Sequence, residues 1–315
     1  MRQSPLAARG RASWEAGGNA GFGTQAGDFL EVLDGQGISP LPGSQAPAIT
    51  GPYGHNSGHG QGHGGMHPLH IEATTVFAFH CKDGTLMVGD HRATTGNVIF
   101  TDQAEKILEL DSHSLMAIAG SPSVALEMAR TLTTSFEYYR RSQLQAMSLT
   151  SKTRALARLL RENLPGTLQG FGVVAPIFAG WETEESAKAA GRTITAKVGK
   201  GRASIWFYDP LGAHFEATQF ASSGSGSLTI KSILSHMDRW GTPPPREMGL
   251  EPAVVLAIRV LMSAASLDSA TGGVEPAIGV YPSVKLLTAD GIKTISPEEQ
   301  AEIWKKHASS PAKKP

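Results

Sequence analysis

The sequence predicts an α+β protein in which two stacked β-sheets lie between layers of helices. The elements follow the order strands, two helices, strands, two helices, strands. Single strands do not alternate with single helices, which argues against a doubly wound parallel sheet. The 315 residues are enough to bury the core of one large domain of this kind.

The first strands begin at Thr74, where the character of the chain changes. Residues 74–81, TTVFAFHC, are a β-branched and aromatic run, and residues 85–90, TLMVGD, form a second run after the turn KDG. This pattern is typical of a β-hairpin. Two more strands are expected at 97–101 and 114–119, separated by the segment DQAEKILELDSH.

Two helices should follow these strands. In residues 121–143 the apolar side chains recur at helical spacing and form one stripe, made by Val124, Met128, Leu132, Phe136 and Tyr139. A second helix is predicted over 150–164, and Pro165-Gly166 should end it.

The second half of the chain repeats this organisation. Helices are expected at 226–237 and 252–267, a proline-rich loop at 241–249, and a last amphipathic helix at 297–307. Strands are expected at 172–180, 203–208, 214–222, 277–287 and 292–295.

Residues 1–73 differ from the rest of the chain. They hold 16 of the 36 glycines and five of the 11 histidines and show no sustained period, so a disordered leader is expected before a domain spanning 74–315. The histidines are spaced four and then three residues apart, which would place metal ligands on one face of a helix, but the glycines oppose helix formation. We expect no metal site; metal storage by the leader is the alternative. The histidines are His55, His59, His63, His67 and His70.

Composition excludes several classes of function. Lys+Arg 28 balance Asp+Glu 28, so no charge pattern points to nucleic acid or to an anionic membrane. Cys81 is the single cysteine, which excludes a disulfide framework and a site built on several thiolates. The first thirty residues lack the apolar core of a secretory signal, and the apolar stretches 171–181 and 252–265 are too short or are interrupted by Arg259. A cytoplasmic, soluble protein without a cofactor is expected.

Thr74 is the first candidate for chemistry. A cut after Ala73 would make Thr74 an N-terminal residue that carries both a hydroxyl nucleophile and an α-amino group. Because such an amine titrates near pH 8, it can accept the hydroxyl proton without a histidine. Asp90 follows after sixteen residues and Lys106 after sixteen more, and together they can form a buried ion pair beneath the nucleophile.

Three loops complete the candidate site. The segments 224–227, GSGS, and 268–273, DSATGG, supply hydroxyls and a carboxylate that could bind the α-amino group. Gly120, beside the start of a helix, could donate its backbone N–H to an oxyanion.

From Thr74 to about residue 296 the chain resembles a proteasome β-subunit of the bacterial 20S type. TTVFAFHCKDGTLMVGDHRAT resembles the family's N-terminal hairpin, and GNVIFTDQAEKI resembles the segment with the catalytic lysine. The resemblance implies the four-layer αββα fold of the N-terminal nucleophile (Ntn) hydrolases and a threonine endopeptidase. It assigns the nucleophile, the ion pair, the oxyanion donor and the residues around the amine to Thr74, Asp90, Lys106, Gly120, Ser225, Asp268 and Thr271.

The resemblance also implies a first specificity pocket, a propeptide and partners. The pocket should favour cleavage after hydrophobic residues, because an uncharged lining cannot compensate a buried charge. The leader should be removed autocatalytically, although Ala73 stands where relatives usually have glycine. Implied partners are six further copies in a β-ring, outer α-rings, an ATPase unfoldase and unfolded substrates, in many bacteria tagged with a ubiquitin-like protein. The pocket residues are Ala93, Thr94, Ala104, Leu108, Ile118, Pro122 and Leu126.

Two other functions are alternatives to this one. The chain could be a catalytically silent β-subunit that only completes a ring, yet no expected active-site residue is missing. It could also belong to the two-component ATP-dependent bacterial peptidase, which has a short leader; the long leader and the two loop segments disfavour that assignment. His91 and Cys81 are interpreted as structural residues.

Overall fold

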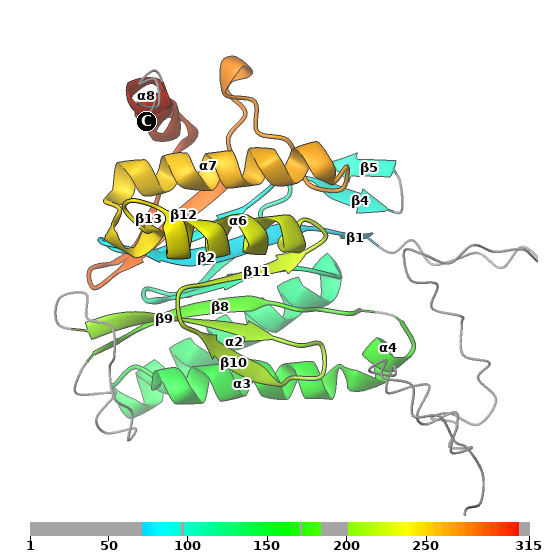
Figure 1. Ribbon diagram of the computed structural model, residues 1–315. Coiled ribbons are helices and arrows are strands. Elements are labelled where there is room, and N and C mark those ends of the chain that lie inside the picture. Colours follow the sequence, from blue (N-terminus) through cyan, green and yellow to red (C-terminus); the bar gives the residue numbers. More distant parts are fainter. Residues whose placement is uncertain (1–70, 96–97, 171, 184–200, 309–315) are drawn as a thin grey trace, which may run out of the picture. The chain divides into compact units, whose positions relative to one another are not determined.

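The structure is a computed structural model that describes residues 71–95, 98–170, 172–183 and 201–308. In this part of the chain, two five-stranded sheets face each other, and a pair of helices covers the outer face of each (Figure 1). The predicted αββα sandwich is therefore confirmed. Every strand pair in both sheets is antiparallel.

The first sheet has the strand order β11-β2-β3-β12-β13. At its centre the predicted hairpin is confirmed, because β2 pairs with β3 from Val76 opposite Gly89 to Cys81 opposite Gly84. The five strands are β2 (Thr75–Cys81), β3 (Gly84–Gly89), β11 (Phe220–Gly224), β12 (Ser283–Thr288) and β13 (Gly291–Thr294).

The second sheet has the strand order β10-β9-β8-β7-β6. Its strands are β6 (Ile107–Asp111), β7 (Ser114–Ala117), β8 (Ile177–Thr183), β9 (Gly201–Tyr208) and β10 (His214–Ala217). A smaller sheet, β1-β4-β5, consists of β1 (Ile71–Ala73), β4 (Ala93–Thr95) and β5 (Val98–Thr101).

The helices lie where the apolar periodicity predicts them. Those of the two outer layers are α2 (Pro122–Gln143), α3 (Leu149–Glu162), α6 (Ser227–Trp240) and α7 (Leu250–Leu267). Shorter elements are α4 (Leu164–Leu168), η1 (Pro245–Glu247) and η2 (Pro276–Ile278), and the chain ends its described part in α8 (Pro297–Ala308).

Alternation along β2 divides the core into layers. Phe77 and Phe79 face α6 and α7, whereas Val76 and Ala78 face the second sheet. A third cluster, which includes Met116 and other residues of the second sheet, is covered by α2 and α3. Each sheet is thus apolar on both faces, as a four-layer arrangement requires.

Helix α7 is, among the described helices, the one that is long and apolar enough to cross a membrane. Nine of its residues, among them Val254, Ile258 and Leu261, are buried, and these three belong to the cluster that packs on the first sheet. Burial against a sheet accounts for this composition.

Four sequence predictions need correction. The expected strand 214–222 is two strands in different sheets, β10 paired with β9 and β11 paired with β2, because the chain bends at 218–219. The region expected as a strand at 277–287 begins with η2, and only Ser283–Thr288 pair in the sheet. The strand expected at 172–180 begins at Ile177 and runs to Thr183.

The fourth correction concerns β6, which lies in a segment expected to separate two strands. Its charged residues depress β-propensity, but Glu109 pairs with Lys285 of β12 and Asp111 with Lys152 of α3. Strands β1 and β4 also lay outside the predicted elements, since three residues are too few to show a period. Residues 1–70, including the histidine run, lie outside the described residues.

Candidate active site

Thr74 lies between β1 and β2 and is 3% exposed. The residues before it are held by β4, because Ala73 lies opposite Thr94 in the β1-β4 ladder. The residues after it begin the central hairpin. The carbonyl of Thr74 accepts a hydrogen bond of 3.2 Å from the backbone N–H of Ser225. The bond between Ala73 and Thr74 therefore sits at the junction of two sheets.

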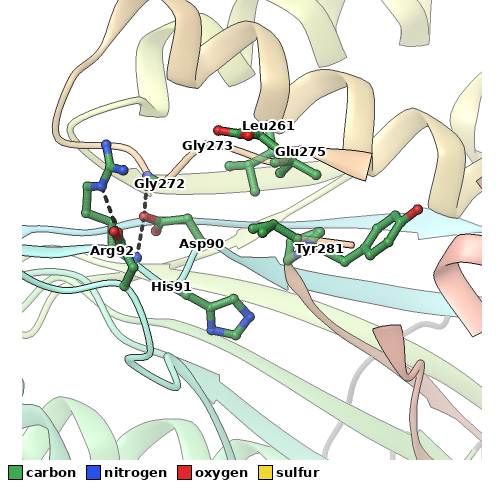
Figure 2. Close-up of a pocket in the computed structure, with 12 residues that line it drawn as sticks. Asp90, His91, Arg92, Leu261, Gly272, Gly273, Glu275 and Tyr281 are labelled. Atoms are coloured by element: carbon green, nitrogen blue, oxygen red, sulfur yellow. Dashed lines mark hydrogen bonds and ion pairs between the residues drawn. The ribbon is translucent and has the colours of Figure 1, made fainter. Parts of the chain in front are cut away.

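Asp90 directly follows β3, and its carboxylate is 1% exposed. Oδ1 accepts hydrogen bonds from the Thr75 N–H at 2.9 Å and from Lys106 Nζ at 2.6 Å. Oδ2 accepts from the N–H groups of Gly272 and Arg92 at 2.7 and 3.1 Å, as Figure 2 shows. Four donors thus compensate the buried negative charge.

Lys106 makes the buried ion pair that the spacing predicts. Its side chain is 3% exposed, and Nζ also donates to the carbonyl of Arg92. Burial lowers the pKa of the Lys106 ammonium below its ordinary value, although the charge and the hydrogen bond of Asp90 oppose this shift.

A chain of hydroxyl contacts joins Asp268 to the start of β2. Thr271 Oγ1 donates to Asp268 Oδ2 at 2.6 Å and lies 2.6 Å from Thr75 Oγ1. The hydroxyl of Ser225 lies 3.5 Å from Thr75 Oγ1, which also accepts the N–H of Gly226 at 3.1 Å. Burial raises the pKa of Asp268, but hydrogen bonds from Ser225, Thr271 and a backbone N–H outweigh it, so the pKa lies below its ordinary value.

Sequence reasoning missed Thr75 as a member of the site. Its side chain is buried and links the GSGS and DSATGG segments through the contacts just described. Its place in a β-branched run made it indistinguishable from an ordinary strand residue. Its role is evident only from the structure, in which the GSGS and DSATGG segments both contact its side chain.

Gly224 allows these loops to approach Thr74. Its φ is +96°, and a Cβ there would overlap the carbonyl oxygen of Thr74. At Gly226 a Cβ would lie 2.7 Å from Thr271 Oγ1. Glycine is therefore required at both positions by close packing on the candidate nucleophile and its neighbour.

Gly120 stands between β7 and α2 with φ of +101°. It forms an isolated antiparallel bridge with Val174, and the two bonds of this bridge run from the N–H of Ser121 to Val173 and from the N–H of Ala175 to Ala119. The N–H of Gly120 itself is not used by the bridge. A side chain at Gly120 would overlap the Val173 carbonyl.

The predicted pocket residues all lie between β4 and the first turns of α2. Ala93, Thr94 and Ile118 are buried, and the other four are partly exposed: Ala104, Leu108, Pro122 and Leu126. None of the seven lines the cavity of about 220 Å³ behind Asp90, whose walls include His91, Tyr281 and Leu261 (Figure 2).

His91 and Cys81, interpreted from the sequence as structural residues, have the following surroundings. His91 Nδ1 lies 3.3 Å from the carbonyl of Ala104. Cys81 is buried in the core, and burial raises the pKa of its thiol. Among the described residues, no group of three or more His, Cys, Asp and Glu side chains could hold a metal ion.

Comparison with known proteins identifies the family of this chain. The family model described as "Proteasome subunit" matches residues 71–198. A "Proteasome subunit beta" of Streptosporangium roseum is 34% identical over 87% of this chain and 89% of its own length. The chain belongs to the proteasome β-subunit family. Proteins of the same name from Stackebrandtia nassauensis and Acidothermus cellulolyticus are 33% and 34% identical, over 86% and 85% of this chain and 86% and 81% of their own lengths.

The proteasome β-subunit fold brings together residues that lie far apart in the sequence. Asp90 contacts both Lys106 and the loop at Gly272, and Thr271 contacts Thr75. Five of the predicted residues therefore lie together in space around Thr75 and Asp90, and Thr74 is joined to them through its carbonyl, which accepts the N–H of Ser225. The five are Asp90, Lys106, Ser225, Asp268 and Thr271.

Proposed function

We propose that this chain is the catalytic β-subunit of a bacterial 20S proteasome, a threonine endopeptidase whose nucleophile is Thr74. The buried Asp90–Lys106 pair, joined through Asp90 to the N–H of Thr75, is the observation that carries the proposal. A buried ion pair costs desolvation and rarely benefits stability over apolar side chains. Its place one residue along the chain from the buried Thr74 favours a catalytic role.

The reaction begins with hydrolysis of the Ala73–Thr74 bond, which frees the α-amino group. This amine accepts the proton of the Thr74 hydroxyl as Oγ1 attacks the carbonyl carbon of the substrate. The tetrahedral oxyanion accepts a hydrogen bond from the backbone N–H of Gly120, which lies beside the start of α2. As the C–N bond breaks, the ammonium gives its proton to the leaving amine and an ester remains.

Water then releases the ester. The free amine of Thr74 takes a proton from the water, whose oxygen attacks the ester carbonyl, and returns it to Oγ1 as the C–O bond breaks. Both half-reactions use the same base and the same oxyanion donor, so no further group is required.

Lys106 and the hydroxyl cluster prepare these groups. A positive charge near Oγ1 lowers the pKa of the hydroxyl, and Asp90 holds that charge in place. Ser225, Asp268 and Thr271 lie around the start of β2, where they can bind the new ammonium group.

Residues 1–73 would be a propeptide removed in cis by the same nucleophile with a different base, because the nitrogen of Thr74 is still an amide before the cut. A water molecule takes the hydroxyl proton as Thr74 Oγ1 attacks the carbonyl carbon of Ala73; the C–N bond breaks, the Thr74 nitrogen gains a proton, and water then hydrolyses the ester that remains. The β1-β4 ladder supports this cut, because it holds Ala73, the residue before the scissile bond, against Thr94. Ala73 in place of glycine should slow the cut, since the turn into Thr74 then carries a side chain.

Substrates would be unfolded proteins, cleaved after hydrophobic residues. The seven predicted pocket residues are all uncharged, which supports this preference. The relatives are named as proteasome β-subunits, which supports the assembly of this chain in rings with further copies of itself and with α-subunits. A heptameric ring, an ATPase unfoldase and a cytoplasmic location complete the proposal.

Replacement of the nucleophile tests it. Thr74→Ala should retain residues 1–73 and lose peptidase activity, because neither the cut nor the attack has a hydroxyl. Thr74→Ser is the matched control, which keeps the hydroxyl and should process. Intact mass and hydrolysis of a peptide with a hydrophobic residue before the cut are measured on particles assembled with the α-subunit.

Each outcome separates this function from its alternatives. Full activity in Thr74→Ala would overturn the proposal. An unchanged chain that assembles in rings but keeps its leader and hydrolyses nothing would be the catalytically silent subunit. Assembly with an ATPase ring in the absence of α-subunits would indicate the two-component peptidase.

A further inference from the structure

The segment 104–107, which leads through Lys106 into β6, is joined to the first sheet at each residue before β6. At its start, the N–H of Ala104 donates to the carbonyl of His91 at 2.9 Å, and His91 Nδ1 lies 3.3 Å from the carbonyl of Ala104. Figure 2 shows the ring of His91 pointing away from the carboxylate of Asp90. The chain therefore enters β6 bound to the residue that follows Asp90.

Glu105 makes two further contacts through one carboxylate. Its Oε1 accepts the N–H of Ile107 at 2.9 Å, and its Oε2 accepts the hydroxyl of Ser283 at 2.7 Å. Ser283 belongs to β12 and lies opposite Gly89, the last residue of β3. This carboxylate therefore binds the backbone of β6 and, in the other sheet, the strand that pairs with β3.

Lys106 lies between these contacts, and both its backbone and its ammonium group are held. Its carbonyl accepts the N–H of Ile118 at 2.9 Å, and Nζ donates to Asp90 and to the carbonyl of Arg92. A Cβ added at Gly89 would lie 3.4 Å from the Cβ of Lys106, so the two segments approach closely. A small shift of the Lys106 backbone would therefore move Nζ relative to Asp90.

Glu105 is exposed, which limits what its hydrogen bonds contribute to stability. Hydrogen bonds of an exposed carboxylate add little to the free energy of unfolding, because water can replace either partner. The rate of a reaction is more sensitive, since a catalytic group displaced by about 1 Å can slow it about 100-fold. Loss of these bonds should therefore affect the reaction more than the folding.

We propose that Glu105 is a positioning residue that holds Lys106 in place beside Asp90. It acts through its hydrogen bonds to Ser283 and to the backbone of β6. The proposal rests on the proposed function, in which the charge of Lys106 helps the hydroxyl of Thr74 to lose its proton. Leader removal and peptide hydrolysis use the same hydroxyl, so both should slow when these bonds are lost.

Replacement of Glu105 tests this role in particles assembled with the α-subunit. Glu105→Ala removes both hydrogen bonds and should lower kcat for a peptide substrate about threefold to tenfold, with KM unchanged. Glu105→Gln keeps an oxygen for the N–H of Ile107 and an amide that can bind Ser283, so it should restore most of kcat. Ser283→Ala should reproduce part of the loss, and adding it to Glu105→Ala should cause no further loss.

Glu109→Ala is the matched control. Glu109 is an exposed carboxylate of β6 that also binds β12, through Lys285 Nζ at 2.8 Å, but it lies three residues beyond Lys106. This variant should lower the midpoint of urea unfolding at least as much as Glu105→Ala does, and it should leave kcat unchanged. Stability and rate are thereby measured separately.

The outcomes separate failure of this role from failure of the proposed function. If the unchanged chain hydrolyses peptide and Glu105→Ala keeps its kcat, the positioning role is overturned and the proposed function stands. An equal loss of kcat in Glu109→Ala or in Glu105→Gln would also overturn the role. Absence of hydrolysis by the unchanged chain would overturn the proposed function, and the positioning role with it.

Discussion

At the scale of single residues, the site depends on buried polar groups that compensate one another. Asp90 accepts four hydrogen bonds while Lys106 donates to Asp90 and to a carbonyl. A charge buried at this depth without a partner would cost desolvation free energy, so each group depends on the other. Stability and the proposed chemistry therefore depend on the same pair.

Asp90→Asn should destabilise the protein by about 3 to 5 kcal/mol, since it leaves the Lys106 charge buried without its partner. The midpoint of urea unfolding measures the loss. The double variant Asp90→Asn/Lys106→Met should recover part of it, because no unpaired charge remains. Glu162→Gln, which breaks an exposed pair with Arg158, should cost below about 1 kcal/mol. Equal costs for Asp90→Asn and Glu162→Gln would contradict the argument.

Thr271 is the residue that connects Asp268 to Thr75. Thr271→Val keeps the shape and removes the hydroxyl, which should cost about 1 to 3 kcal/mol and lower the peptidase rate. Thr271→Ser keeps the hydroxyl and should stay close to the unchanged chain in both measurements. A loss in Thr271→Ser but not in Thr271→Val would show that packing of the methyl group, not the hydrogen bonds, stabilises this position.

The same substitution predicts a change with pH. Because the folded pKa of Asp268 lies below the unfolded value of about 3.9, its contribution to stability is present above that pH and is lost as pH falls through the folded pKa. Thr271→Val removes one donor and raises the folded pKa. The midpoint of acid unfolding should move to higher pH in this variant and stay in place in Thr271→Ser.

At the scale of elements, the candidate site residues lie at junctions between elements. The candidate nucleophile, Asp90 and Gly120 all stand at strand ends rather than within strands. Strand ends free backbone groups from the ladder, so that an N–H such as that of Gly120 can face a ligand. A positive φ at this junction turns the chain from β7 into α2.

Gly120→Ala should therefore be costly, because the added Cβ meets both an unfavourable φ and the Val173 carbonyl. Gly279→Ala is the matched control, with φ of +80° and nothing within 4 Å of the added atom. We expect about 1 kcal/mol for the control and roughly 1 to 3 kcal/mol more for Gly120→Ala, with loss of leader removal. Thermal unfolding and intact mass give the two readouts; equal stability of the two variants would refute the clash.

At the scale of the whole molecule, three apolar layers hold the sandwich together. One lies between the sheets, and one lies between each sheet and its helices. The layers are continuous from element to element, so most core positions are surrounded on every side and few can relax around a cavity.

Leu261 of α7 is fully buried in one of these layers, whereas Leu267 of the same helix is 77% exposed. Leu261→Ala should cost about 2 to 5 kcal/mol, and the identical change at Leu267 about 0.5 kcal/mol or less. Urea unfolding of the unassembled chain measures both. A large cost at Leu267 would mean that α7 does not end as the structure has it.

The sequence by itself determined the two hairpin strands, the four long helices, the αββα class and the spacing of Thr74, Asp90 and Lys106, because periodicity and turn residues act locally. It did not determine β6, whose charged residues look unlike a strand until Lys285 and Lys152 face them. Nor did it separate β10 from β11, since the sheet to which a strand belongs depends on partners distant in the chain. Only the tertiary structure placed Thr75 against Thr271, because two loops, 150 and 196 residues away along the chain, must close on it before its hydroxyl has a partner.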